Sequence, residues 1–220
     1  MSSSVLQLLV LAAIAVFLIL RLRSVLGTRE GYEKPVSKPV EAEERPRRRD
    51  FAVIEGGQDR DITDHVADGT PAARALAAMK IAEPGFSVGD FLHGARGAYE
   101  MILMSFEKGD LEAIRPFLAE DVAESFAEVI HAREREGLKV EANFVGLREI
   151  ALHDATFDRD TRDAEVTVRF TGEITSVVRN RIGEVVEGSP TEIKRQRDVW
   201  TFARKMGVDD PNWQLVATGE

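Results

Sequence analysis

The feature that most limits how this chain folds is an apolar segment near its amino terminus. Residues 5–20 read VLQLLVLAAIAVFLIL, in which fifteen of the sixteen residues are apolar and Gln7 is the exception. A helix rises about 1.5 Å per residue, so this segment covers roughly 24 Å, and its extension to Leu26 exceeds the roughly 30 Å of a hydrocarbon layer. The sequence therefore predicts a transmembrane anchor over residues 1–26.

The charges beside this segment favour a retained anchor over a cleaved secretory signal. Such a signal begins with a basic region and ends at a small-residue cleavage site. Here no Lys or Arg precedes the apolar run, and Arg21 and Arg23 follow it. Because loops that stay in the cytoplasm carry an excess of Lys and Arg, we expect one membrane crossing with the carboxy-terminal domain in the cytoplasm.

Residues 27–69 have the composition of a disordered, charged linker. Three prolines interrupt a run of Glu, Lys, Ser and Arg, and such a composition buries too little apolar surface to offset the cost of ordering. Arginines at the end of the apolar segment and in the densest basic cluster are the candidate contacts to lipid headgroups: Arg21, Arg23, Arg45, Arg47, Arg48 and Arg49. The alternatives for the cluster are a docking motif and a solvated linker.

The net charge of −9 is divided unevenly along the chain. Residues 21–49 hold nine Lys and Arg against five Asp and Glu, whereas residues 50–220 hold twenty against thirty-three. The acidic part repels nucleic acid, so we expect no nucleic-acid partner.

Residues 70–220 show the periodicity of helices first and of strands afterwards. Apolar residues recur every three or four positions over residues 88–106 and 120–136, as on one face of a helix, and a shorter alanine-rich helix is expected over residues 72–82. Alternation of apolar and polar residues then predicts strands over residues 139–157, 164–179, 199–203 and 213–217. This order predicts an α+β domain, with helices packed on one face of a curved, antiparallel, four-stranded sheet.

No motif of catalysis or of cofactor binding occurs in the sequence. It contains no phosphate-binding loop, no dinucleotide fingerprint, no His-Glu-x-x-His and no Gly-x-Ser-x-Gly, and its four histidines lack the spacing of metal ligands. The absence of cysteine excludes disulfides, thiolate nucleophiles and cysteine–zinc sites. We therefore expect no catalytic residues, no cofactor and no metal, and interpret the chain as non-enzymatic.

Several segments resemble the Tim44-like family, in the order in which that family has them. They are FLHGARGAYE at residues 91–100, GDL at 109–111, VTVRF at 166–170, DVWTFAR at 198–204 and DPNWQLVAT at 210–218. The family is named for the inner-membrane tether of the mitochondrial import motor, and the short anchored form resembles its bacterial members, those of alphaproteobacteria in particular. The resemblance implies a cone-like fold related to nuclear transport factor two, an apolar pocket between helices and sheet, and association with the inner membrane and its lipids, including cardiolipin.

Aromatic residues of the predicted helix and strands are the candidates for lining this pocket: Phe91, Tyr99, Phe170, Trp200 and Phe202. An open pocket suits an acyl chain or a hydrophobic segment of a partner, whereas the same side chains can also fill the core. Because related cone folds include enzymes with a carboxylate and a tyrosine in the pocket, Asp198 and Tyr99 are a second candidate pair, with Asp198 as base and Tyr99 as oxyanion donor. The alternative is a structural tyrosine, with Asp198 paired to Arg169 or Arg204.

The sequence thus predicts a membrane-tethered, non-catalytic adaptor of the inner membrane, acting in protein translocation or membrane-protein assembly. Its expected partners are membrane lipids and an inner-membrane or cytoplasmic protein. The alternatives are a protein that binds lipid or another hydrophobic ligand in the pocket, and an enzyme that uses Tyr99 and Asp198.

Overall fold

The computed structural model describes residues 59–219. The predicted transmembrane anchor, most of the predicted linker and all six arginines expected at lipid headgroups lie outside the described residues. From residue 59 to residue 219, no helix has both the length and the apolar character that a membrane crossing needs.

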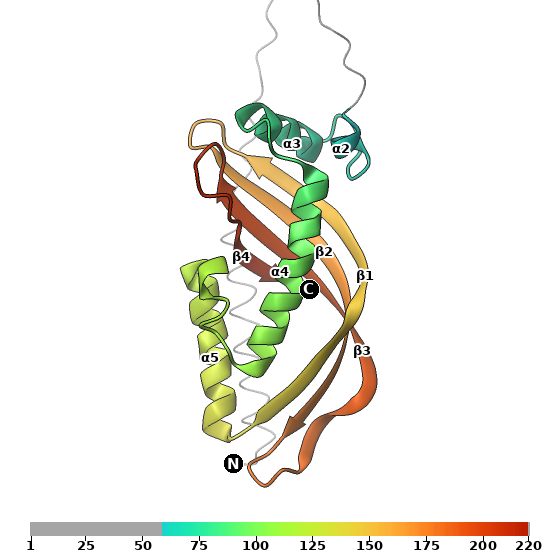
Figure 1. Ribbon diagram of the computed structural model, residues 1–220, viewed down its shortest axis with the longest axis vertical. Coiled ribbons are helices and arrows are strands. Elements are labelled where there is room, and N and C mark those ends of the chain that lie inside the picture. Colours follow the sequence, from blue (N-terminus) through green and yellow to red (C-terminus); the bar gives the residue numbers. More distant parts are fainter. Residues whose placement is uncertain (1–58, 220) are drawn as a thin grey trace, which may run out of the picture. The chain divides into compact units, whose positions relative to one another are not determined.

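The described chain forms helices first and an antiparallel sheet afterwards. The helices are α2 (Arg60–Thr63), α3 (Pro71–Ala82), α4 (Val88–Lys108), the 3₁₀ helix η1 (Arg115–Phe117) and α5 (Glu120–Glu136). The strands are β1 (Lys139–Phe157), β2 (Asp163–Arg179), β3 (Val185–Lys205) and β4 (Gln214–Gly219), in the sheet order β1-β2-β3-β4. The sheet is strongly curved, and α4 runs along its inner side (Figure 1).

The predicted α+β class with helices on a four-stranded antiparallel sheet is therefore confirmed, whereas the relation to nuclear transport factor two stays a prediction. The ends of α4 and α5 follow local signals in the sequence. The Ser87 hydroxyl accepts the Asp90 N–H and begins α4, and Gly109 ends α4 in the left-handed conformation with φ 76°. Gly137 ends α5 in the same way. These are the ordinary cap residues of a helix.

Strand β3 is much longer than the sequence predicted. We expected a strand only over residues 199–203, because the preceding residues do not alternate between apolar and polar. Pairing with β2 nevertheless keeps them extended, with a register shift where Thr175 and Ser176 face Ile193 and Ser189. Gly188 lies beside this bulge at φ 74°, and a Cβ atom there would lie 2.1 Å from the Ser176 carbonyl oxygen. The turn between β2 and β3 is at Gly183, whereas Gly188 pairs with Val177 next to the bulge.

The folded domain also begins earlier than predicted. The end of the predicted disordered linker, residues 59–69, contains helix α2, whose Ile62 is buried in the core. The Asp61 carboxylate accepts the backbone N–H groups of Val88 (2.8 Å) and Gly89 (2.9 Å) and pairs with Lys80. The first N–H groups of a helix lack partners within the helix, so a carboxylate there is stabilising. The sequence did not reveal this role, because the backbone partners of Asp61 lie 27 and 28 residues away.

Replacing Asp61 with Asn should lower the free energy of unfolding by about 1–2 kcal/mol at neutral pH. Burial by itself raises the pKa of Asp61, but the hydrogen bonds from Lys80, Gly89, Val88 and Ser87 outweigh it and lower the pKa from 3.8 to about 2. The contribution is therefore complete above the ordinary pKa and is lost as the pH falls toward 2.

Urea unfolding of the two proteins over a pH series measures this difference. Asp64→Asn is the matched control, because Asp64 is an exposed residue of the same segment. Equal stabilities of Asp61→Asn and Asp64→Asn at neutral pH would contradict the capping role.

Candidate functional site

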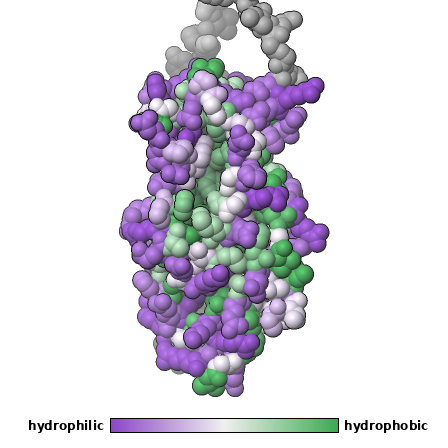
Figure 2. All heavy atoms as spheres, in the orientation of Figure 1, coloured by the Kyte–Doolittle hydropathy of each residue, from purple (hydrophilic) through white to green (hydrophobic). Residues whose placement is uncertain are grey.

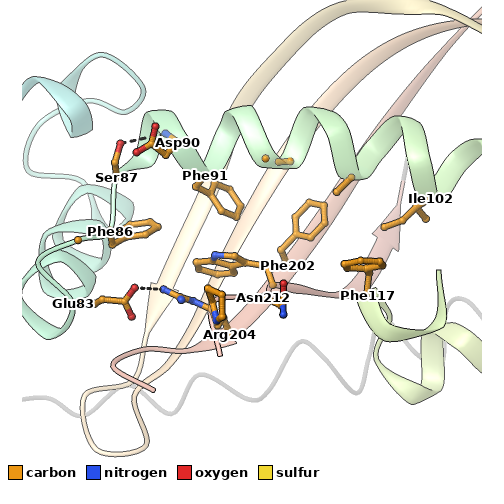
Figure 3. A pocket seen from close by; sticks show the side chains of 16 residues that line it. Glu83, Phe86, Ser87, Asp90, Phe91, Ile102, Phe117, Phe202, Arg204 and Asn212 are labelled. Atoms are coloured by element: carbon orange, nitrogen blue, oxygen red, sulfur yellow. Dashed lines mark hydrogen bonds and ion pairs between the residues drawn. The ribbon is translucent and has the colours of Figure 1, made fainter. Parts of the chain in front are cut away.

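A largely apolar cavity lies between α4, the end of β3 and the residues that lead into β4. It has a volume of about 440 Å³, within the range of small-ligand sites. Five aromatic side chains surround it, and we call it the aromatic pocket: Phe86, Phe91, Phe117, Phe202 and Trp213. Figure 3 shows Phe86, Phe91, Phe117 and Phe202 turned toward the same space below α4. In the space-filling view, apolar residues run along the middle of one face between polar margins (Figure 2).

Small residues on α4 leave the pocket open. Gly94, Ala95 and Ala98 face it at the helical spacing of three and four. A Cβ atom added at Gly94 would meet no atom within 4 Å. The ring of Phe91 packs against Trp213 with a centroid distance of 4.8 Å and against Phe202 at 6.1 Å, so the walls are held by edge contacts between rings.

An ion pair forms the polar end of the pocket (Figure 3). Arg204 Nη2 lies 2.6 Å from Glu83 Oε1, and its guanidinium lies 5.3 Å from the centroid of the Trp213 ring. The Gly207 N–H donates to the other Glu83 oxygen. Burial raises the pKa of Glu83, but the Gly207 N–H and Arg204 outweigh it and hold the pKa below its ordinary value. Both side chains are therefore ionised, and their opposite charges cancel.

The five aromatic residues predicted for the pocket divide into two groups. Phe91 and Phe202 line it. Tyr99, Phe170 and Trp200 are 0 %, 0 % and 4 % exposed and pack against one another in the core, with the Tyr99 and Phe170 rings stacked at 4.4 Å. The sequence left open whether these residues line a pocket or fill the core. Two of them line the pocket, and the other three fill the core beside it.

Tyr99 and Asp198 meet, but they are not among the residues that line the pocket. The Tyr99 hydroxyl donates to Asp198 Oδ2 at 2.5 Å, and Gln196 Nε2 also donates to this oxygen. Burial and the Asp198 charge raise the pKa of Tyr99, so the phenol stays protonated. The predicted partners of Asp198 were wrong, because Arg169 pairs with Glu149 and Arg204 with Glu83. This geometry is that of a structural hydrogen bond.

A second cavity, of about 610 Å³, lies where α4, α5 and β1 approach one another. Charged side chains of both signs line it, among them Glu107 and Arg133, whose charged groups are 3.8 Å apart. Burial raises the pKa of Glu107. Across residues 59–219 no group of three His, Asp or Glu side chains could hold a metal ion. The aromatic pocket is therefore the candidate site.

The family model of the Tim44-like domain matches residues 72–220, more than half of the chain. This chain belongs to the Tim44-like family. Human mitochondrial import inner membrane translocase subunit TIM44 is 24 % identical over 167 residues, which cover 71 % of this chain and 36 % of that protein. The chain thus spans about a third of the length of this relative. Among solved structures, the intermembrane space region of chloroplast protein ARC6 has a TM-score of 0.39 and 11 % identity, covering 58 % of this chain and 93 % of that one.

Several residues that shape the pocket of this Tim44-like domain were missed from the sequence. Phe86 follows the helix break at Pro84 and Gly85, and Phe117 lies in η1. Trp213 precedes the last strand and was assigned to it. These residues lie in connections, where no periodicity tells whether a side chain faces inward. A large aromatic residue in a short polar connection was the available signal.

Replacing Gly172 with Ala should destabilise the domain by about 1–3 kcal/mol, the usual range for overpacking a core. Gly172 of β2 lies beneath Tyr99, and a Cβ atom there would lie 2.7 Å from the Tyr99 hydroxyl and 3.1 Å from its ring. Thermal or urea unfolding measures the loss. Gly146→Ala in the neighbouring strand is the control, since its Cβ atom would meet nothing within 4 Å.

The double variant Gly172→Ala, Tyr99→Phe tests the cause. Removing the hydroxyl relieves the closest contact, so the double variant should be less destabilised than the sum of the two single changes. Strict additivity would show that Tyr99 does not set the space above Gly172.

Proposed function

We propose that this chain is a membrane-tethered, non-catalytic adaptor in protein translocation or membrane-protein assembly, and that its Tim44-like domain holds a protein partner in the aromatic pocket. The observation that carries the proposal is an open apolar pocket in a domain of this family. An apolar cavity with few polar groups is the usual form of a site for a hydrophobic group. The name of the human relative, a translocase subunit, supports the process.

The proposed location is the inner membrane, with a single crossing over residues 1–26 and the domain in the cytoplasm. The length of the apolar run supports a membrane crossing. The position of the basic residues after it supports the orientation. The arginines between residues 21 and 49 would lie within reach of anionic headgroups, each favourable by about 1 kcal/mol near the surface.

A second candidate function is binding of a lipid or another hydrophobic ligand in the same pocket. The volume of about 440 Å³ and the aromatic walls favour it. The enzymatic alternative has weaker support, because Tyr99 and Asp198 bond to each other away from the pocket.

A matched pair of glycine substitutions on α4 tests the adaptor function. Gly94→Met puts a long side chain into the pocket, whereas Gly97→Met puts the same side chain on a part of α4 that does not line it. A Cβ atom at either glycine meets nothing within 4 Å, so both changes are tolerated and both gain helix propensity. Only Gly94→Met should impair binding.

The measurement is cross-linking in the native membrane. Because the chain has no cysteine, a single cysteine placed at pocket residue Asn212 carries a photo-cross-linker at one defined position. We expect one dominant protein adduct, reduced about tenfold or more by Gly94→Met and unchanged by Gly97→Met. Adducts to acyl chains alone would favour the second candidate function, and equal protein adducts in both variants would refute a role of the pocket.

A further inference from the structure

We infer that the aromatic pocket recognises a protein segment that carries a Lys or Arg beside an apolar side chain. The inference rests on the proposed function, since it names the chemistry of the partner that the pocket holds. Apolar walls alone would bind an anionic amphiphile equally well. The inference therefore distinguishes a cationic protein segment from such an amphiphile.

The cation in the pocket wall is already neutralised. The Arg204 side chain is only 7 % exposed, and its Nη2 bonds to Glu83 at 2.6 Å and contacts the Met206 sulfur at 3.4 Å. Its Nε is buried and has no hydrogen-bond partner in the described chain, so this donor does not face solvent in the pocket. An incoming phosphate or carboxylate that bonds to Nη2 would have to displace Glu83, which would leave Glu83 partly buried without its cation.

The charge that remains at the pocket is negative. Asp90 lines the pocket from the first turn of α4, and the residue is exposed. Its carboxylate makes no ion pair with any residue between 59 and 219. With Glu83 and Arg204 compensating each other, Asp90 leaves the pocket a net charge of −1, which attracts a cation and repels an anionic head group.

The charge of the whole domain acts in the same direction. Residues 50–220 hold twenty Lys and Arg against thirty-three Asp and Glu. Such an excess raises the local concentration of cationic partners and lowers that of anionic ones. The ring faces of the pocket add to this, because aromatic faces attract ammonium and guanidinium groups. A basic and hydrophobic peptide segment therefore fits the apolar walls of the pocket, the negative charge of Asp90 and the net negative charge of the domain.

The test uses the full chain in nanodiscs of uncharged phosphatidylcholine and a phage library of random short peptides. The library is first passed over the Gly94→Met variant, which removes phages that bind outside the pocket, and is then selected on the unchanged protein. We expect retained peptides enriched in Lys or Arg next to large apolar residues. We also expect their affinity to fall with rising salt.

A charge reversal at the pocket provides the matched comparison. Asp90→Lys should weaken the selected peptides about tenfold or more, as expected for an attraction turned into a repulsion at short range. Glu100→Lys, an exposed residue of the same helix that does not line the pocket, should leave the affinity within about twofold. Circular dichroism of both variants checks that they stay folded.

Three results would overturn the inference: no retained peptide, retained peptides without basic enrichment, or equal effects of Asp90→Lys and Glu100→Lys. Displacement of the peptides by dodecyl phosphate from Asp90→Lys but not from the unchanged protein would support it further. If cross-linking in the membrane still depends on Gly94 while one of the three results is obtained, the proposed function stands and only the chemistry of the partner is wrong.

Discussion

The contact between Tyr99 and the sheet decides how the rest of the domain is arranged. Tyr99 lies on the inner face of α4, stacks on Phe170 of β2 and bonds to Asp198 of β3, so one side chain joins the helix to two strands. Gly172 permits this approach because any larger residue would collide with the phenol. The distance between α4 and the sheet is therefore set at this point, and the curved sheet must leave space elsewhere along the helix.

The aromatic pocket is that space, and its size follows from residues at both of its ends. The α4 residues Gly94, Ala95 and Ala98, which line the pocket, are small. Their side chains therefore do not fill the space between the helix and the sheet. The start of the helix is itself held in place by Asp61, which bonds to Val88 and Gly89. A helix fixed on both sides of a cavity cannot collapse into it without breaking one of these contacts, so the pocket is preformed.

The sequence predicted the elements of this domain better than it predicted the site. Caps such as Ser87, Gly109 and Gly137 act through neighbouring backbone groups, so local sequence is sufficient to identify them. The role of Asp61 depends on partners 26 to 28 residues away, which no local pattern reveals. The pocket is harder still to predict, because Phe91 and Tyr99 share one apolar helix face. Which of them lines a space and which fills the core depends on the curvature of the sheet.

The ion pair between Glu83 and Arg204 shows why the shape of a pocket is insufficient to define its ligand. In the sequence, Arg204 directly follows the predicted strand that carries Phe202, and it was a candidate partner of Asp198. In the structure it is 7 % exposed and compensated by Glu83, which a helix–helix connection brings from more than a hundred residues away. A buried pair of this kind contributes little net stability. Its effect is to remove a positive charge from the pocket, so the net charge at the pocket is set by Asp90.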